Sequence, residues 1–182
     1  MRRRSIREAR GSVIAEAALV LPLMFTILLG IFWVGRGFNT YEVMLHAARE
    51  GARIAATATC ATCGNIGYGV DSGGADIVAS SYVAPILQAS GVNLKLVTAP
   101  AVATGLCTCA QINCTPPACS RSSGQPQILV CPNVDMGIPS YTPAVCGTAV
   151  MFQFPYSLPL PFAPASVQTV TLTARALART EQ

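Results

Sequence analysis

Charged side chains are scarce in this 182-residue chain, and histidine is nearly absent. Only 11% of the residues are Asp, Glu, Lys or Arg, against about 25% in a typical soluble domain. His46 is the single histidine, and with Glu42 one turn before it and Arg49 after it we expect a polar-face residue rather than a catalyst or a metal ligand. The few acids beyond residue 40 show no spacing typical of a catalytic pair. We therefore expect no enzyme activity, no catalytic residue, no metal and no cofactor.

The net charge of +4 is concentrated at the N-terminus. Residues 1–10 hold five Arg and one Glu, which gives +4, whereas residues 11–182 hold seven basic and seven acidic side chains. Nucleic-acid binding would need basic residues clustered on a folded surface, so no nucleic-acid partner is expected. The positive-inside rule instead places the arginine-rich end, a leader of residues 1–11, in the cytoplasm.

A membrane-length apolar run follows this leader. From Val13 to Val34 the only ionisable side chain is Glu16, and about 20 apolar residues suffice to cross a bilayer as a helix. A cleaved secretory signal is the alternative, but its apolar core is about 7–15 residues long and ends at a small-x-small site. We therefore expect a single-pass anchor in a lipid bilayer, with the C-terminal domain exported.

The helix is predicted to continue beyond the bilayer to residue 58, which makes residues 12–58 one transmembrane and projecting helix. Apolar and polar side chains recur there on two neighbouring faces at helical spacing. The apolar stripe is Tyr41, Leu45, Ala48, Ala52 and Ala55. The polar face is Glu42, His46, Arg49 and Arg53. Small residues four apart, such as Ala47 and Gly51, permit close packing of the backbone, and Pro22 favours a kink within the span.

Eight cysteines lie beyond the apolar run. They are Cys60, Cys63, Cys107, Cys109, Cys114, Cys119, Cys131 and Cys146. An even number in an exported domain predicts disulfides, although 105 pairings are open. Cys60 and Cys63 have the spacing of a redox or zinc pair, yet they follow a helix and no second matching pair occurs, so structural disulfides are favoured.

Residues 59–182 are predicted to form an α+β domain with a small antiparallel sheet backed by the long helix. A second helix is expected over 75–90, interrupted at Pro85 and stopped by Gly91. Residues 107–127 show no periodicity, and residues 154–164 are predicted as a proline-rich hairpin loop. Strands are expected over residues 92–97, 128–131, 148–154 and 166–176.

The N-terminal segment resembles the TadE-like family of the tight-adherence (Flp, or Tad) pilus machinery. The shared landmarks are Arg10-Gly11, Glu16, the Leu-Val-Leu-Pro of residues 19–22, Gly30, Gly35-Arg36 and the Ala-Ala-Arg-Glu-Gly-Ala-Arg of residues 47–53. The resemblance implies a bacterial minor pilin or pseudopilin, a structural subunit of a pilus or secretion apparatus. Such a subunit would be anchored in the inner membrane, with its C-terminal domain in the periplasm or outside. Its partners would be other pilin-like subunits, the Tad machinery and a prepilin peptidase.

The resemblance also implies roles for residues near the start of the span. A prepilin peptidase would cut after Gly11, leaving Ser12 as the new N-terminus and Glu16 as the fifth residue. Ala17 stands where processed members usually carry an aromatic residue, so an uncut, anchored chain is the other outcome. Pro22 would contribute to assembly through its kink.

Two interpretations of Glu16 remain open from the residues alone. Its carboxylate either pairs with the Ser12 amine of its own or another chain, which lowers the cost of both charges in lipid, or reaches the headgroups without a partner. The alternative function is a bitopic envelope protein whose disulfide-rich exterior binds a surface partner and takes no part in a filament.

Overall fold

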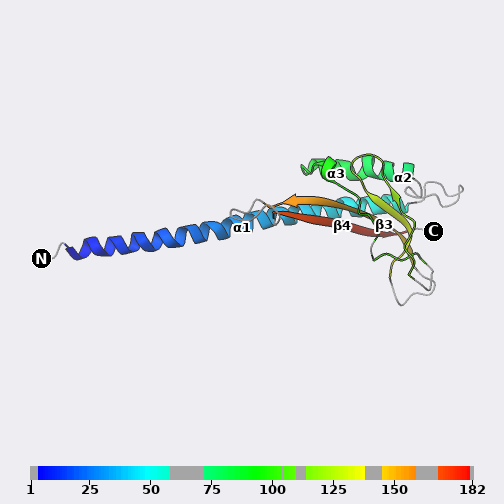
Figure 1. Cartoon of the computed structure of the whole chain (residues 1–182). Helices are drawn as coiled ribbons and strands as arrows, with labels where there is room; N and C mark the ends of the chain where they lie inside the picture. Colours follow the sequence, from blue (N-terminus) through cyan, green and yellow to red (C-terminus); the bar gives the residue numbers. More distant parts are fainter. Residues whose placement is uncertain are drawn as a thin grey trace.

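In the computed structural model of the chain, the residues that are described are 4–57, 72–103, 105–109, 114–137, 145–158 and 168–180. One long helix, α1 (Arg4–Ala56), extends away from a small domain and also forms part of that domain. The second half of α1 packs on the sheet, whereas the first half stands clear of it (Figure 1). The predicted α+β class, with a long helix backing an antiparallel sheet, is confirmed.

The helix α1 begins earlier than predicted. It starts at Arg4 rather than at residue 12, because residues 6–10 are Ile, Arg, Glu, Ala and Arg, which favour or tolerate helix, and contain neither Gly nor Pro. The helix also continues through Pro22 without interruption. At its other end it stops at Ala56, two residues before the predicted boundary.

A second helical segment follows, and it is one run rather than a helix broken at a proline. It comprises α2 (Ser72–Ile77), the π-helix η1 (Val78–Val83) and α3 (Ala84–Ala89). Pro85 lies in the first turn of α3, where the missing N–H is not needed. The irregularity lies instead in the wider π-helical turns. Gly91 adopts φ +73°, a left-handed conformation that ends the helix as predicted.

The strand predicted over residues 92–97 is wrong. The segment forms a short 3-10 helix, η2 (Leu94–Leu96), and only Thr98 makes a β-bridge, with Gln153. The Asn93 side chain accepts a hydrogen bond from the Lys95 backbone N–H at 3.1 Å, which stabilises a turn. The turn buries Val92 and Val97 at its two ends. The alternation of apolar and polar residues therefore reflects this turn and not a strand.

The sheet has four antiparallel strands in sequence order. They are β1 (Ser120–Arg121), β2 (Leu129–Asp135), β3 (Cys146–Ser157) and β4 (Thr169–Arg179). The strands predicted at 128–131, 148–154 and 166–176 are confirmed, each with extended or shifted ends. The short β1 falls in the stretch predicted to be irregular. Strands β3 and β4 pair along their whole length, from Gly147 opposite Arg179 to Ser157 opposite Thr169.

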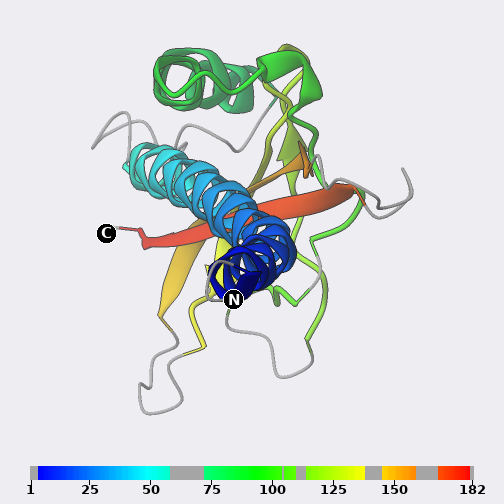
Figure 2. The same cartoon turned by 90° about the vertical axis from the view of Figure 1, so that its left-hand side faces the viewer.

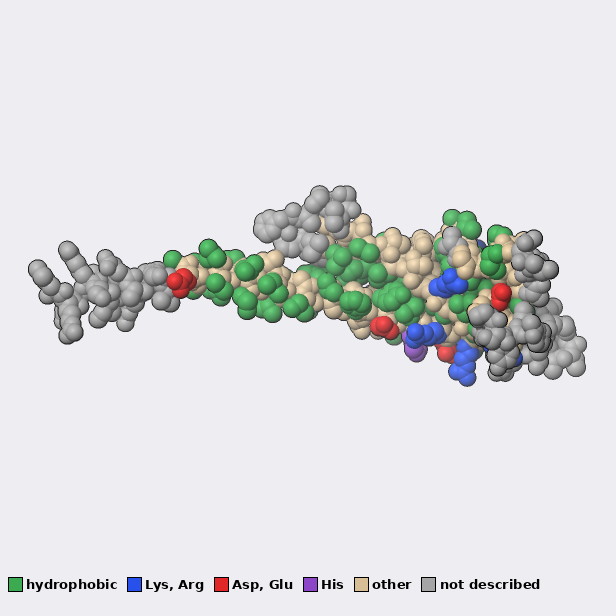
Figure 3. All heavy atoms as spheres, turned by 90° about the horizontal axis from the view of Figure 1, so that it is seen from below, with side chains coloured by type: hydrophobic (Ala, Val, Ile, Leu, Met, Phe, Trp, Pro, Cys, Tyr) green, Lys and Arg blue, Asp and Glu red, His purple; other side chains and the backbone are tan. Residues whose placement is uncertain are grey.

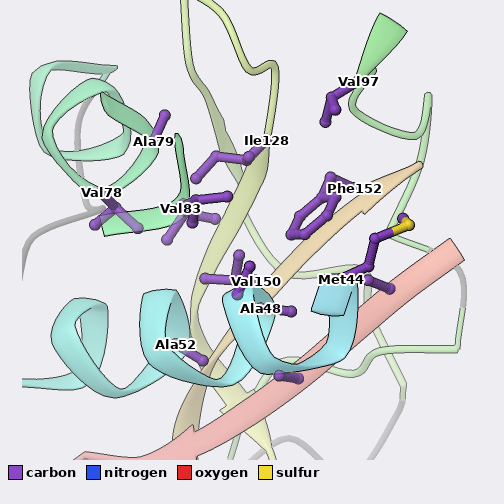
Figure 4. Packing of buried hydrophobic residues seen from close by; sticks show 14 of the residues in the cluster. Met44, Ala48, Ala52, Val78, Ala79, Val83, Val97, Ile128, Val150 and Phe152 are labelled. Carbon is purple, nitrogen blue, oxygen red and sulfur yellow. The ribbon is translucent and has the colours of Figure 1, made fainter. Parts of the chain in front are cut away.

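The main core lies between one face of the sheet and the two helical segments. Val150 and Phe152 on β3 point toward α1, whose Ala48 and Ala52 lie against them, and Val83 of η1 closes the cluster (Figure 4). These five side chains are fully buried. Figure 2 looks nearly along α1 and shows the α2–α3 segment above α1 and β4 crossing behind it.

A second, smaller cluster covers the opposite face of the sheet. It contains Leu129, Ala149 and Met151 from the strands and Leu106 from the preceding loop. Three disulfides hold this loop region together: Cys107–Cys114, Cys109–Cys146 and Cys119–Cys131. The predicted structural role is thereby confirmed for six of the cysteines. Cys60 and Cys63 lie outside the described residues.

Candidate functional site

The first half of α1 stands clear of the domain over most of its described length and is strongly apolar. Fourteen large hydrophobic side chains between Ile14 and Phe38 are exposed, from 39% at Leu29 to 76% at Leu19. Large exposed apolar surfaces on proteins mark contact with membranes or other proteins. The helical stretch Ile14–Ala56 is long and apolar enough to cross a membrane, with a mean hydropathy of 2.4 in its most apolar part. Figure 3 shows hydrophobic side chains along this half of α1.

The predicted processing and assembly residues all lie on α1. Gly11 and Ser12 are followed by Glu16, whose side chain is exposed near the start of the apolar surface. Residues four apart in a helix are separated by about 6 Å along its axis and share a face. The backbone of Ser12 is therefore one helical turn from Glu16, which is the spacing that the pairing interpretation assumes. A carboxylate at the end of a span costs less than one at its centre.

The backbone around Pro22 receives support from a side chain. The Thr26 hydroxyl donates a hydrogen bond to the Pro22 carbonyl oxygen at 2.8 Å. Hydroxyl groups bonded to the carbonyl four residues earlier are associated with bending of helices. Pro22 and Thr26 together mark the position in the apolar half of α1 where a bend is expected.

The second half of α1 separates the two predicted faces. The polar face of Glu42, His46, Arg49 and Arg53 is exposed. On the apolar face Ala48, Ala52 and Ala55 are buried, whereas Tyr41 and Leu45 are partly buried. The small residues bring α1 close to the chain's own domain: a Cβ on Gly51 would be 3.4 Å from Val78 Cγ1 and 3.6 Å from Val150 Cγ1.

A junction between the exposed and the packed halves of α1 was not predicted. Tyr156 of β3 lies against Gly37, and its hydroxyl donates a hydrogen bond to the Trp33 carbonyl oxygen at 3.4 Å. The guanidinium carbon of Arg36 is 6.0 Å from the centre of the Trp33 ring, within the range of a cation–π interaction. A tryptophan and an arginine at the end of an apolar run are typical of a membrane interface, and this signal was available in the sequence.

Two hollows flank Tyr156 at this junction. The apolar groove, as we call it, has a volume of about 330 Å³. Its lining is Val34, Gly37, Phe38, Tyr41, Tyr156, Leu158, Val170 and Leu172. The other hollow, of about 420 Å³, is more polar and includes Trp33, Arg36 and Asn39 of α1. Part of the sheet therefore reaches the level of the helix at which the apolar surface ends.

Asp76 in α2 is the described residue whose titration is clearly altered. Its carboxylate accepts hydrogen bonds from the Ser123 hydroxyl at 2.8 Å, the Ser123 backbone N–H at 2.6 Å and the Gly124 backbone N–H at 3.3 Å. These bonds favour the charged form and hold the pKa of Asp76 below its usual value. The contact ties α2 to the turn after β1. Within the described ranges, no three His, Cys, Asp or Glu side chains are grouped as metal ligands would be.

A comparison with known protein families gives a match to most of α1. Residues 11–53, which are 43 of the 182 residues, match the sequence model of the family described as TadE-like protein. No match was found among curated proteins or among solved structures. The match confirms the resemblance and supports a pilin-like role associated with the Tad pilus. The segment that carries Gly11, Glu16, Pro22 and the helical side of the junction is therefore a TadE-like segment.

Proposed function

We propose that this protein is a membrane-anchored minor pilin or pseudopilin of a bacterial Tad (Flp) pilus or secretion apparatus. Its work is structural rather than catalytic: the first half of α1 packs with the helices of neighbouring subunits in the membrane. The observation that carries this proposal is the division of α1 into an exposed apolar half, with Glu16 near its start, and a half built into the domain.

The proposed orientation follows from charge. The arginine-rich end stays in the cytoplasm and the disulfide-linked domain is exported across the inner membrane. Disulfides persist in oxidising compartments, and the three described pairs agree with an exported domain. The neighbours on this proposal are other pilin-like subunits and the Tad machinery.

Processing at Gly11–Ser12 gives Glu16 a defined role. Cleavage creates an amine on Ser12 with an ordinary pKa near 8, and this amine and the Glu16 carboxylate are both costly in lipid. Pairing between neighbouring chains removes much of both costs and favours one register of assembly. Binding of a prepilin peptidase to residues 1–11 precedes this step.

The first test is the mature N-terminus in the native host. Mass spectrometry should detect a chain that begins at Ser12, and deletion of the prepilin peptidase gene should restore the full-length chain. A chain that starts at Met1 with the peptidase present would contradict the pseudopilin role. It would favour the alternative of a bitopic envelope protein with an external binding domain.

The second test concerns Glu16. Glu16→Gln and Glu16→Ala should insert at normal levels yet reduce pilus output and co-purification with other subunits, and Glu16→Asp should be intermediate. Breaking a buried ion pair costs about 3–5 kcal/mol, which is enough to disrupt assembly. Glu42→Gln is the matched control, because it removes the same charge from an exposed position on the same helix. Normal assembly of Glu16→Ala would mean that the carboxylate only reaches the headgroups.

A further inference from the structure

The apolar groove lies where the lipid-facing surface of α1 meets the sheet. On the helix side, Val34, Phe38 and Tyr41 occupy one face, at positions i, i+4 and i+7. On the sheet side, Val170 and Leu172 form the opposite wall. Phe38 is 65% exposed and Val170 is 43% exposed, so both walls present apolar side chains to the surroundings of the protein.

Specific contacts between α1 and β3 hold the walls of the groove in place. Gly37 has no side chain, and a Cβ placed there would be only 3.3 Å from Cε1 of Tyr156. The glycine therefore lets the tyrosine ring lie close to the helix. The hydrogen bond from Tyr156 to the Trp33 carbonyl oxygen holds the ring in place.

The groove lies at the depth at which the hydrocarbon layer ends. Twenty helical steps from Ile14 to Val34 span about 30 Å, which equals the thickness of a bilayer's hydrocarbon core. Trp33 and Arg36, next to the groove, form the aromatic–basic pair expected at the interface. An arginine at this height is placed to contact lipid phosphates.

The apolar surface is continuous from the span into the groove. Ile27, Ile31, Val34 and Phe38 follow one another at spacings of three or four, and all are more than half exposed. Figure 3 shows hydrophobic side chains along α1 continuing to the place where the helix reaches the domain. Lipid that covers Ile31 therefore also reaches Val34 and Phe38.

We infer that the apolar groove binds the acyl chain of a phospholipid from the leaflet on the domain's side, so that the Tyr156 end of the sheet rests on the membrane surface. This inference rests on the membrane-anchoring part of the proposed function. It adds a second membrane contact, made by β3 and β4, to the anchor itself. Burial of the apolar side chains of both walls against the acyl chain favours the contact.

The test uses tryptophan as a depth probe, because Trp33 is the single tryptophan of the chain. The full chain carrying Trp33→Phe plus Val170→Trp is reconstituted in phospholipid vesicles brominated near the glycerol end of the acyl chains. We expect its fluorescence to fall to half or less of that in unbrominated vesicles. Trp33→Phe plus Leu177→Trp is the matched control, because Leu177 is also exposed but lies toward the other end of β4; it should not be quenched.

The outcomes separate the groove from the anchor. Quenching of native Trp33 without quenching of the Val170→Trp probe would overturn the inference and leave the anchor intact. Absence of quenching at Trp33 itself would contradict anchoring and the inference together. Quenching of the Val170→Trp probe that disappears as the protein-to-lipid ratio rises would show that a second copy covers the groove, which also overturns the inference.

A second tryptophan position controls for misfolding of the Val170→Trp variant. Phe38→Trp in the Trp33→Phe background replaces one exposed aromatic residue by another on the helical wall of the groove, and it should be quenched to a similar degree. The absence of free thiols under non-reducing conditions checks that each variant has formed its disulfides. Quenching at Phe38→Trp but not at a correctly folded Val170→Trp would overturn the contact with the sheet.

Discussion

Gly51 of α1 lies against Val83 of η1 so closely that a Cβ on Gly51 would be 2.9 Å from the Val83 Cγ2 atom. Val83 is fully buried, so it has little room to move aside. The absence of a side chain at residue 51 therefore sets the distance between α1 and the π-helical segment. The two elements form one wall of the core.

We expect Gly51→Leu to lower the free energy of unfolding of the domain by about 1–3 kcal/mol or more, since overpacking forces neighbouring side chains apart. Gly35→Leu in the same helix is the control, because no atom lies within 4 Å of a Cβ at that position. Denaturant unfolding of the detergent-solubilised chain measures both. Equal stability of the two variants would contradict the packing described for Gly51.

Phe152 provides a test of the core itself. Its side chain is fully buried between α1 and the sheet, so Phe152→Ala should cost about 3–5 kcal/mol. Phe38→Ala removes the same ring from an exposed position and should leave the unfolding free energy of the domain nearly unchanged. Thermal unfolding followed by circular dichroism compares the two. A small effect at Phe152 would show that the core is not formed as described.

The disulfides should contribute unequally. Cys109–Cys146 joins residues 37 apart, whereas Cys107–Cys114 joins residues seven apart. Loop-closure entropy predicts stabilisation of about 4 kcal/mol for the first and about 2.5 kcal/mol for the second. The double variants Cys109→Ser/Cys146→Ser and Cys107→Ser/Cys114→Ser test this in denaturant unfolding. A larger loss from the short loop would contradict the entropic account.

We expect the folded domain to lose stability in acid because of Asp76. Its pKa is lowered in the folded protein by bonds to Ser123 and Gly124, so its contribution is present above the unfolded pKa of about 3.9. This contribution is lost as the pH falls through the folded pKa, because the unfolded state binds the proton first. Asp76→Asn should weaken the dependence of the melting temperature on pH below about 4. An unchanged dependence would mean that these bonds do not persist in solution.

The long helix and the strands were predictable because their signals are local. An apolar run with one carboxylate specifies the first half of α1. The alternation along β4 specifies a strand that is buried on one face, whereas the apolar run of β3 is buried on both faces. The segment 92–97 gave the same alternation from a turn, since Gly91 and the Asn93 side chain direct Val92 inward without a strand.

The junction and the disulfide pairs depend on contacts between residues distant in the chain. Trp33 and Tyr156 are in contact although 123 residues separate them in the sequence. No local sequence pattern predicts such a contact. The partners of Cys131 and Cys146 follow from the places of these residues on β2 and β3, which the cysteine count alone leaves open. Gly11, Ser12 and Glu16 were found from the motif, and their roles stay predictions.

The continuity of α1 has a mechanical consequence. Its 53 residues form one rod of about 80 Å without a loop between the apolar half and the domain. Such a rod transmits torque. A rotation of its apolar first half about the helix axis therefore turns the polar face of Glu42 and Arg49 by nearly the same angle. Axial force on the span is likewise borne directly by the core around Ala48 and Phe152. On the proposed anchoring, the direction in which the domain faces is thus set by how its helix is held inside the bilayer.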